Sequence, residues 1–122
     1  MDMKILIADD NQAIRQMIRR CLADLATEIR EVDDGANAIV AYAEFLPDWV
    51  LMDIEMRSVG GIAATAAIKA LFPDANIVIV TNHNDATLRE KAAGAGACGY
   101  VLKEDLIDLR GFLTMNEPET RV

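Results

Sequence analysis

The sequence predicts a single α/β domain: a doubly wound, five-stranded parallel sheet with helices on both faces, in three α/β/α layers. The first observation is that five short apolar runs alternate with five longer amphipathic stretches along the 122 residues. The second is composition, since 52% hydrophobic and 26% charged residues are typical of a globular chain. The third is one more polar run, which suits a sheet edge. With right-handed crossovers it favours the strand order 2-1-3-4-5.

Each expected strand is a short run of apolar side chains. Three runs are almost continuously apolar and a fourth is short but similar, as strands buried on both faces of a parallel sheet are. The run at 27–32 differs, because Ile29 and Val32 stand among charged residues, and we place it at the edge. The other four strands are expected at residues 4–8, 49–52, 76–80 and 99–102.

The stretches between the runs carry apolar residues at helical spacing. Asp34 is the expected N-cap of the second helix, and Pro47 and Pro73 are the expected stop signals of the second and third. The first three helices are expected around residues 14–25, 36–43 and 64–72.

The last two helices carry weaker signals. Residues 85–95 are rich in alanine, and Gly94 and Gly96 are expected to close this helix. Residues 106–115 form the expected last helix, which Gly111 is expected to interrupt.

Charge and composition exclude several classes of function. The net charge of −8 disfavours binding to nucleic acid or to an anionic membrane. Cys21 and Cys98 do not suggest a disulfide framework, and no apolar run reaches the roughly 20 residues of a membrane span. Without a signal peptide pattern at its start, the chain is expected to be cytoplasmic.

Polar residues follow the inner strands where each strand ends. These ends meet at one edge of a parallel sheet, where ligands bind in this class of fold. A single residue of this kind fits a helix N-cap or a solvated loop, but five together indicate a site. They are Asp9, Asp10, Asp53, Thr81 and Lys103.

The chemistry of the five residues is consistent with one reaction. Clustered carboxylates repel each other, so they hold either a proton or a cation, and a hard ion such as Mg²⁺ suits their oxygens. An aspartate can act as a nucleophile and form an aspartyl-phosphate. A lysine, a hydroxyl and Mg²⁺ could then bind the transferred phosphoryl group.

At this point the sequence resembles the receiver domain of bacterial two-component response regulators, which has a flavodoxin-like fold. The resemblance runs from Lys4 to about Leu113 and assigns residues 1–115 to the receiver and 116–122 to a polar tail or the start of a linker. It rests on the segments Ile5-Leu6-Ile7-Ala8-Asp9-Asp10, Pro47 to Met56, Val78-Ile79-Val80-Thr81 and Gly96 to Lys103.

The resemblance implies a role for each site residue. Asp53 resembles the phosphoacceptor, which would receive the phosphoryl group from a phosphohistidine on a sensor histidine kinase or a histidine phosphotransfer protein. Thr81 and Lys103 would bind this group. The implied Mg²⁺ ligands are Asp10 directly, Asp9 mostly through water, Asp53, and the main-chain carbonyl of Glu55.

Further residues match positions that modulate or transmit the signal in this family. Tyr100 matches the aromatic switch residue that turns inward when Thr81 moves, with a plain core aromatic as the alternative. Glu55 and His83 match positions that tune dephosphorylation, with solvated side chains as the alternative. Asn82 stands where a small residue is usual and is expected to narrow the donor's approach.

The chain departs from the family pattern in four places, which bear on loop shape and phosphorylation rate. Arg57 replaces a common proline, Gly60 precedes Gly61 and makes that loop more permissive, and Asn82 is larger than usual. Glu104 replaces the proline of a Lys-Pro pair, so we expect a trans peptide bond after Lys103.

The segment from Gly99 to Leu106 resembles receivers of LuxR/NarL-type transcription factors. The chain is therefore either a stand-alone receiver or one domain of a longer transcription regulator, and this chain itself is not expected to bind nucleic acid or a membrane. A phosphorylation-dependent homodimer stays open. The alternatives to a phosphoacceptor are a degenerate receiver that binds partners without phosphate and, less favoured, a phosphatase of another aspartate-nucleophile family.

Overall fold

The computed structural model describes residues 2–116, which form five parallel strands in the order β2-β1-β3-β4-β5. The predicted fold class and strand order are confirmed. Strand β2 lies at the edge, as its charged residues indicated. The strands are β1 (Lys4–Ala8), β2 (Glu28–Val32), β3 (Trp49–Met52), β4 (Ile77–Thr81) and β5 (Gly99–Leu102).

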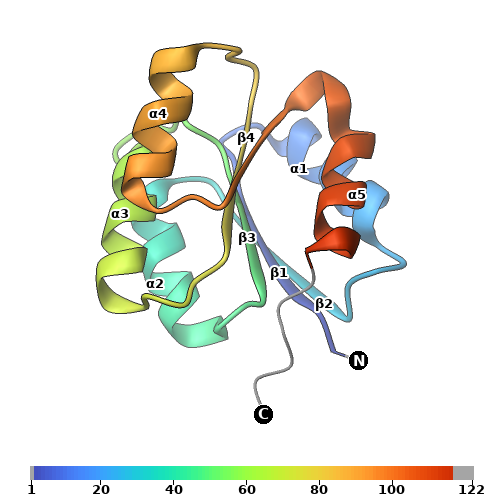
Figure 1. Ribbon diagram of the computed structural model, residues 1–122. Coiled ribbons are helices and arrows are strands. Elements are labelled where there is room, and N and C mark those ends of the chain that lie inside the picture. Colours follow the sequence, from blue (N-terminus) through green and yellow to red (C-terminus); the bar gives the residue numbers. More distant parts are fainter. Residues whose placement is uncertain (1, 117–122) are drawn as a thin grey trace.

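Five α-helices connect and follow the strands, and they divide between the two faces of the sheet (Figure 1). Helices α2, α3 and α4 cover one face, and α1 and α5 cover the other. The helices are α1 (Gln12–Leu22), α2 (Gly35–Phe45), α3 (Gly61–Leu71), α4 (Ala86–Ala95) and α5 (Leu106–Met115), with a 3₁₀ turn at Lys103–Asp105 before α5.

The core consists of two apolar layers, one on each side of the sheet. Successive strand residues alternate between them: Leu6 and Ala8 pack toward α2, α3 and α4, while Ile5 and Ile7 pack toward α1 and α5. All four side chains are at most 1% exposed. This two-sided burial explains why the inner strands read as continuous apolar runs.

The strand register brings the ends of the inner strands to one edge of the sheet. Ala8 lies opposite Met52, and Thr81 lies opposite Leu102. The residues that follow β1, β3 and β5 therefore meet near Thr81.

Two details of the helices differ from the sequence prediction. Gly111 does not interrupt α5, because the helix runs unbroken from Leu106 to Met115. Gly94 lies inside α4, and only Gly96 ends it, with a left-handed φ of 109°. The N-cap role of Asp34 is confirmed, since its side chain accepts a hydrogen bond from the Ala36 amide.

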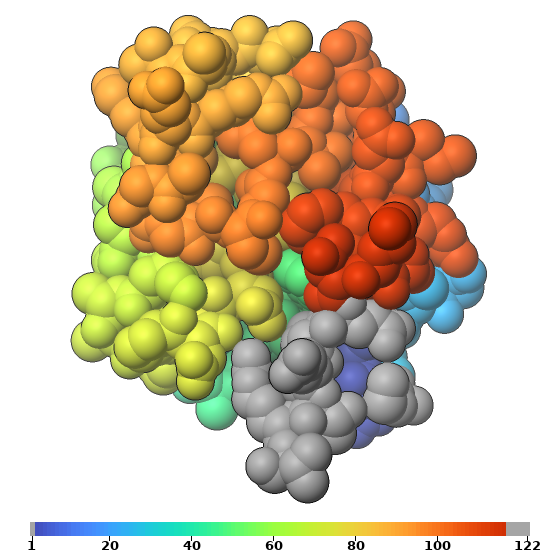
Figure 2. All heavy atoms as spheres, viewed as in Figure 1, coloured from blue at the N-terminus to red at the C-terminus, as the bar shows by residue number. Residues whose placement is uncertain are grey.

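One face of the molecule is formed largely by the last third of the described chain. In Figure 2, α4 (orange) and α5 (red) lie on either side of the segment that leads into and through β5.

No helix among residues 2–116 combines the length and the apolar composition needed to cross a lipid bilayer.

Candidate functional site

Three polar side chains are buried at the ends of the central strands. Asp9, Asp53 and Thr81 are 1%, 6% and 0% exposed. Main-chain hydrogen bonds hold the two aspartates in place, because the Asp53 amide donates to the Ala8 carbonyl at 2.9 Å and the Asp9 amide to the Val32 carbonyl at 3.1 Å. The sheet itself therefore fixes where these carboxylates lie.

Asp9, Asp10 and Asp53 together form an acidic cluster that suits a hard divalent cation. Each offers a carboxylate oxygen, and these oxygens lie within 4.8 Å of one another. Asp10 is exposed and the other two are buried, so the cluster has one side open to solvent. Mg²⁺ typically binds through one or two carboxylates together with phosphate oxygens and water, so these oxygens suit it, and the predicted cluster is present.

Burial and a neighbouring charge change the acidity of Asp53. Burial raises the pKa of its carboxyl group, the charge of Asp9 raises it further, and Lys103 opposes both, with a result of about 6. The carboxylate form of Asp53 is thus less favoured than that of a solvent-exposed aspartate.

Lys103 lies between the two buried carboxylates. Its Nζ is 2.9 Å from Asp9 Oδ2 and 3.4 Å from Asp53 Oδ2. Burial lowers the pKa of Lys103, but the hydrogen bond that its ammonium donates to Asp9 and the two negative charges outweigh this effect and raise the pKa above its ordinary value. The expected pairing with Asp53 is present, and the shorter contact is with Asp9.

An open pocket of about 260 Å³ lies over this cluster. It contains most of the residues singled out from the sequence, including the expected modulating residues Glu55, Asn82 and His83. Its lining consists of Asp10, Asn11, Ile14, Asp53, Glu55, Thr81, Asn82, His83 and Lys103.

Glu55 and His83 meet at the rim of the pocket. His83 Nε2 lies 2.5 Å from Glu55 Oε1, and both side chains are largely exposed. The contact joins the loop after β3 to the loop after β4. The two residues expected to tune dephosphorylation are therefore one contacting pair.

Tyr100 lies outside the pocket lining and is half-buried. Its hydroxyl donates to the main-chain carbonyl of His83 at 2.6 Å. The Arg89 guanidinium lies 4.4 Å from the ring centroid and also donates to Asn84 Oδ1. Tyr100 thus contacts the loop after β4 and α4, and it also packs against the apolar core.

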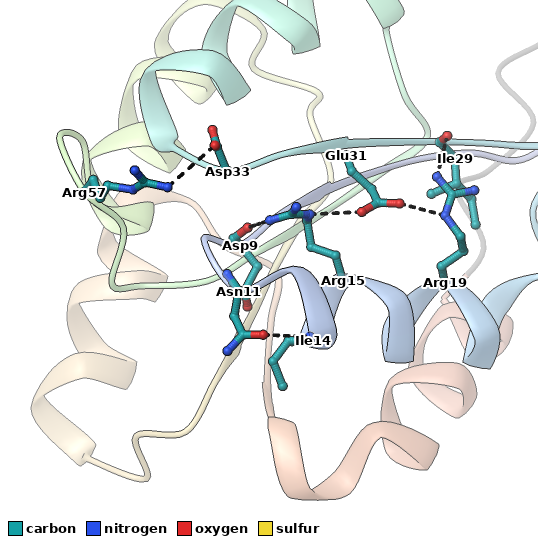
Figure 3. A network of polar contacts seen from close by, with 9 residues as sticks. All are labelled: Asp9, Asn11, Ile14, Arg15, Arg19, Ile29, Glu31, Asp33 and Arg57. Atoms are coloured by element: carbon teal, nitrogen blue, oxygen red, sulfur yellow. Dashed lines mark hydrogen bonds and ion pairs between the residues drawn. The ribbon is translucent and has the colours of Figure 1, made fainter.

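A polar network that was not expected from the sequence lies behind Asp9 (Figure 3). Arg15 donates from Nη1 to the Asp9 carbonyl at 2.6 Å and from Nε to Glu31 at 2.9 Å. Arg19 donates to the other oxygen of Glu31 at 2.7 Å. The network fixes the main chain of Asp9 against α1 and β2. Arg15 and Arg19 lie four residues apart in α1, and this spacing alone does not indicate which groups they contact.

The loop between β3 and α3 is more constrained than its two glycines suggested. Gly60 has an ordinary φ of −72°, and the Gly61 amide donates to the Ile54 carbonyl at 2.8 Å. A Cβ on Gly61 would lie 1.8 Å from the Asp53 carbonyl oxygen. Close approach to Asp53 requires glycine here, so the expected permissive loop is wrong. The expected trans bond after Lys103 is confirmed.

The fold and the acidic site are those of a receiver domain of two-component signalling. The comparison with protein families agrees: residues 5–113 match the response regulator receiver domain. The chain belongs to this family, as its resemblance indicated.

Individual relatives include transcription regulators and a chemotaxis protein. The chain is 36% identical over 104 residues to the transcriptional regulatory protein DegU of Brevibacillus brevis, which covers 83% of this chain and 44% of that protein. It is 35% identical over 100 residues to the chemotaxis protein CheY of Halobacterium salinarum, and this match covers 82% of this chain and 83% of that protein. The chain thus spans about half the length of several curated relatives.

A solved structure gives the same result at the level of the fold. A two-component response regulator of the LuxR family from Aurantimonas sp. SI85-9A1 superimposes with a TM-score of 0.87. It is 32% identical and covers 94% of this chain and 84% of that chain. The chain is therefore similar to LuxR-family receivers in both sequence and fold.

Proposed function

We propose that the chain accepts a phosphoryl group on Asp53 in a Mg²⁺-dependent reaction. The donor is a phosphohistidine on a sensor histidine kinase or a histidine phosphotransfer protein. The observation that carries the proposal is the position of Lys103 between two buried carboxylates, next to a third carboxylate that opens to the pocket.

The reaction requires Asp53 as a carboxylate. One of its oxygens attacks phosphorus, the phosphorus–nitrogen bond of the donor breaks, and the imidazole leaves with the bonding electron pair and takes a proton from solvent. Lys103 and the Thr81 hydroxyl bind the oxygens of the transferred group. Asp9, Asp10, Asp53 and the Glu55 carbonyl would hold Mg²⁺, which neutralises charge on the phosphoryl oxygens.

Phosphorylation would act outward through the loop after β4. The phosphate adds about 1.5 to 2 negative charges beside Thr81. Thr81 is followed by Asn82 and His83, and the His83 carbonyl accepts a hydrogen bond from the Tyr100 hydroxyl. This connection supports Tyr100 and α4 as the elements that respond. The Glu55–His83 pair lies at the rim of the pocket, which supports a role in dephosphorylation.

The second candidate is a degenerate receiver that binds its partners without phosphate. Asn82 in the pocket lining favours it, because a side chain larger than usual at this position is expected to narrow the donor's approach to Asp53. The third hypothesis, a phosphatase, lacks an Asp-x-Asp arrangement after β1 and predicts steady hydrolysis of a phosphoester. In a longer protein the output would be transcription regulation, as in the DegU relative.

Intact-protein mass spectrometry tests the proposal. With Mg²⁺ and acetyl phosphate, the parent should gain one phosphoryl group, and Asp53→Asn and a chelator-treated sample should gain none. Asp48→Asn is the control, since Asp48 bonds the Lys4 amide at the opposite end of the sheet. No gain, together with no Mg²⁺-dependent response to beryllofluoride, would favour the degenerate receiver. Light scattering of the beryllofluoride sample tests for the homodimer.

A further inference from the structure

We propose that Asp34 is a positioning residue for the metal site, because it clamps the β3–α3 loop that carries Glu55. The inference rests on the proposed function for the metal itself. Asp34 lies at the start of α2, far in sequence from the acidic cluster, and neither the family resemblance nor the N-cap signal assigned it such a role.

The clamp consists of hydrogen bonds from the tip of the loop to one carboxylate. Asp34 Oδ1 accepts the Ser58 amide at 2.9 Å and the Val59 amide at 3.2 Å. Its Oδ2 accepts the Ser58 hydroxyl at 2.6 Å and the Ala36 amide, which is the helix cap, at 3.0 Å. A return bond runs from the Gly35 amide to the Val59 carbonyl at 3.0 Å. The loop tip is therefore bound from both directions.

The base of the same loop is closed beside Asp53. The Gly61 amide donates to the Ile54 carbonyl, and the Ile54 amide donates to Asp53 Oδ1 at 2.9 Å. Glu55 lies between this closed base and the clamped tip. Its main chain is thus held from two sides, and Asp34 provides one of them.

The carboxylate form of Asp34 is the form that the clamp requires. The Ser58 hydroxyl, followed by the Ser58 amide, holds the pKa of Asp34 well below its usual range. All four bonded groups are donors, and a carboxylate is an acceptor only. The surrounding geometry is therefore specific for a charged, non-donating side chain.

The Asp34→Asn variant tests the hydrogen bonds to the loop separately from the hydrogen bond that caps α2. Asparagine caps helices about as well as aspartate, so its oxygen can keep the Ala36 bond. In the orientation that keeps this bond, its NH₂ group faces the Ser58 and Val59 amides, and two donors meet where two hydrogen bonds stood. Asp85→Asn is the matched control, because Asp85 caps α4 through the Thr87 and Leu88 amides and also loses a charge at a helix N-terminus.

The test measures Mg²⁺ affinity by calorimetric titration of the full chain, and hydrogen exchange of the loop amides without metal. Groups that orient metal ligands typically contribute 10- to 100-fold to affinity, so Asp34→Asn should weaken Mg²⁺ binding about tenfold or more, and Ser58→Ala by less. The Ser58 and Val59 amides should also exchange faster. Asp85→Asn should bind Mg²⁺ like the parent, and excess Mg²⁺ should restore beryllofluoride binding to Asp34→Asn.

The outcomes separate the two proposals. Equal Mg²⁺ affinity of Asp34→Asn, Asp85→Asn and the parent overturns the role of Asp34 and leaves the proposed function standing. Absence of Mg²⁺ binding by the parent overturns the proposed function and the positioning role together. If Asp34→Asn unfolds, Ser58→Ala, which keeps the cap, decides between the same outcomes.

Discussion

At Gly61 the main chain of α3 approaches the Asp53 carbonyl so closely that no side chain fits. Gly61→Ala should therefore push the loop away from Asp53 and destabilise the protein by about 1 to 3 kcal/mol, as overpacking does. Urea unfolding measures the change. Gly60→Ala is the neighbouring control, because its Cβ would meet the nearest atom, the Ile54 oxygen, at 3.1 Å. Similar losses for both variants would contradict the argument.

Asp34 should make stability depend on pH in acid. Its pKa is lowered by folding from 3.8, so the folded state favours the carboxylate and is stabilised at pH values above the unfolded pKa. This contribution is lost as the pH falls through the folded pKa. The difference in unfolding free energy between the parent and Asp34→Asn should therefore be greatest near pH 7 and shrink below about pH 4. A difference that stays constant with pH in urea unfolding would disprove this.

Gly111 in α5 shows what a glycine inside a helix does to the stability of the protein. A Cβ on Gly111 would meet no atom within 4 Å. Because glycine costs a helix interior up to about 1 kcal/mol relative to alanine, Gly111→Ala should raise the unfolding free energy by about that amount. Gly99→Ala should lower it, since its Cβ would lie 2.7 Å from the Phe112 ring. Denaturant unfolding compares the two, and a destabilised Gly111→Ala protein would contradict the prediction.

Helix α4 should open more readily than α2. Its only fully buried residue is Ala92, whereas α2 buries Ala38, Tyr42 and Phe45. Few buried apolar contacts mean a low free energy of local opening. Hydrogen exchange followed by mass spectrometry should show faster exchange of α4 amides than of α2 amides. Equal protection would count against α4 as the element that responds.

Local patterns were sufficient to predict the elements. The apolar runs placed the strands to within one residue, because burial on both faces leaves few polar positions in them. Gly111 was misjudged because propensity alone cannot show that α5 packs through Leu109 and Leu113, which are both fully buried. Packing outweighs the cost of one glycine.

The acidic cluster, Lys103 and Thr81 could be predicted because strand ends must meet at one sheet edge. The Asp34 clamp could not, since it joins residues 24 positions apart through main-chain amides, which leave no mark on residue type. The contact of Arg15 with the Asp9 carbonyl is hidden for the same reason. Lys103 was expected beside Asp53, but the sequence did not indicate its shorter contact with Asp9.

For the molecule as a whole, burial and mutual repulsion of the clustered carboxylates lower the free energy of unfolding. We expect metal binding to offset this loss. Asp53→Asn should stabilise the metal-free protein near neutral pH by at most about 3 kcal/mol, since its pKa lies about two units above 3.8 and each unit is worth about 1.4 kcal/mol. Mg²⁺ at about 100 times its Kd should stabilise the parent by about 2.7 kcal/mol and Asp53→Asn by less. Thermal unfolding with and without a chelator measures both. An equal gain from Mg²⁺ in both proteins would place the ion elsewhere.

The two outer strands have a consequence for association between chains. Within residues 2–116, β2 pairs only with β1 and β5 only with β4, so each leaves one row of main-chain groups unpaired. Such edges are templates for unwanted strand addition and fibril growth. Strand β2 presents Glu28 and Arg30 in exposed positions, and β5 is only four residues long. The charged residues of β2 and the short length of β5 thus disfavour the addition of further strands and amyloid-like stacking.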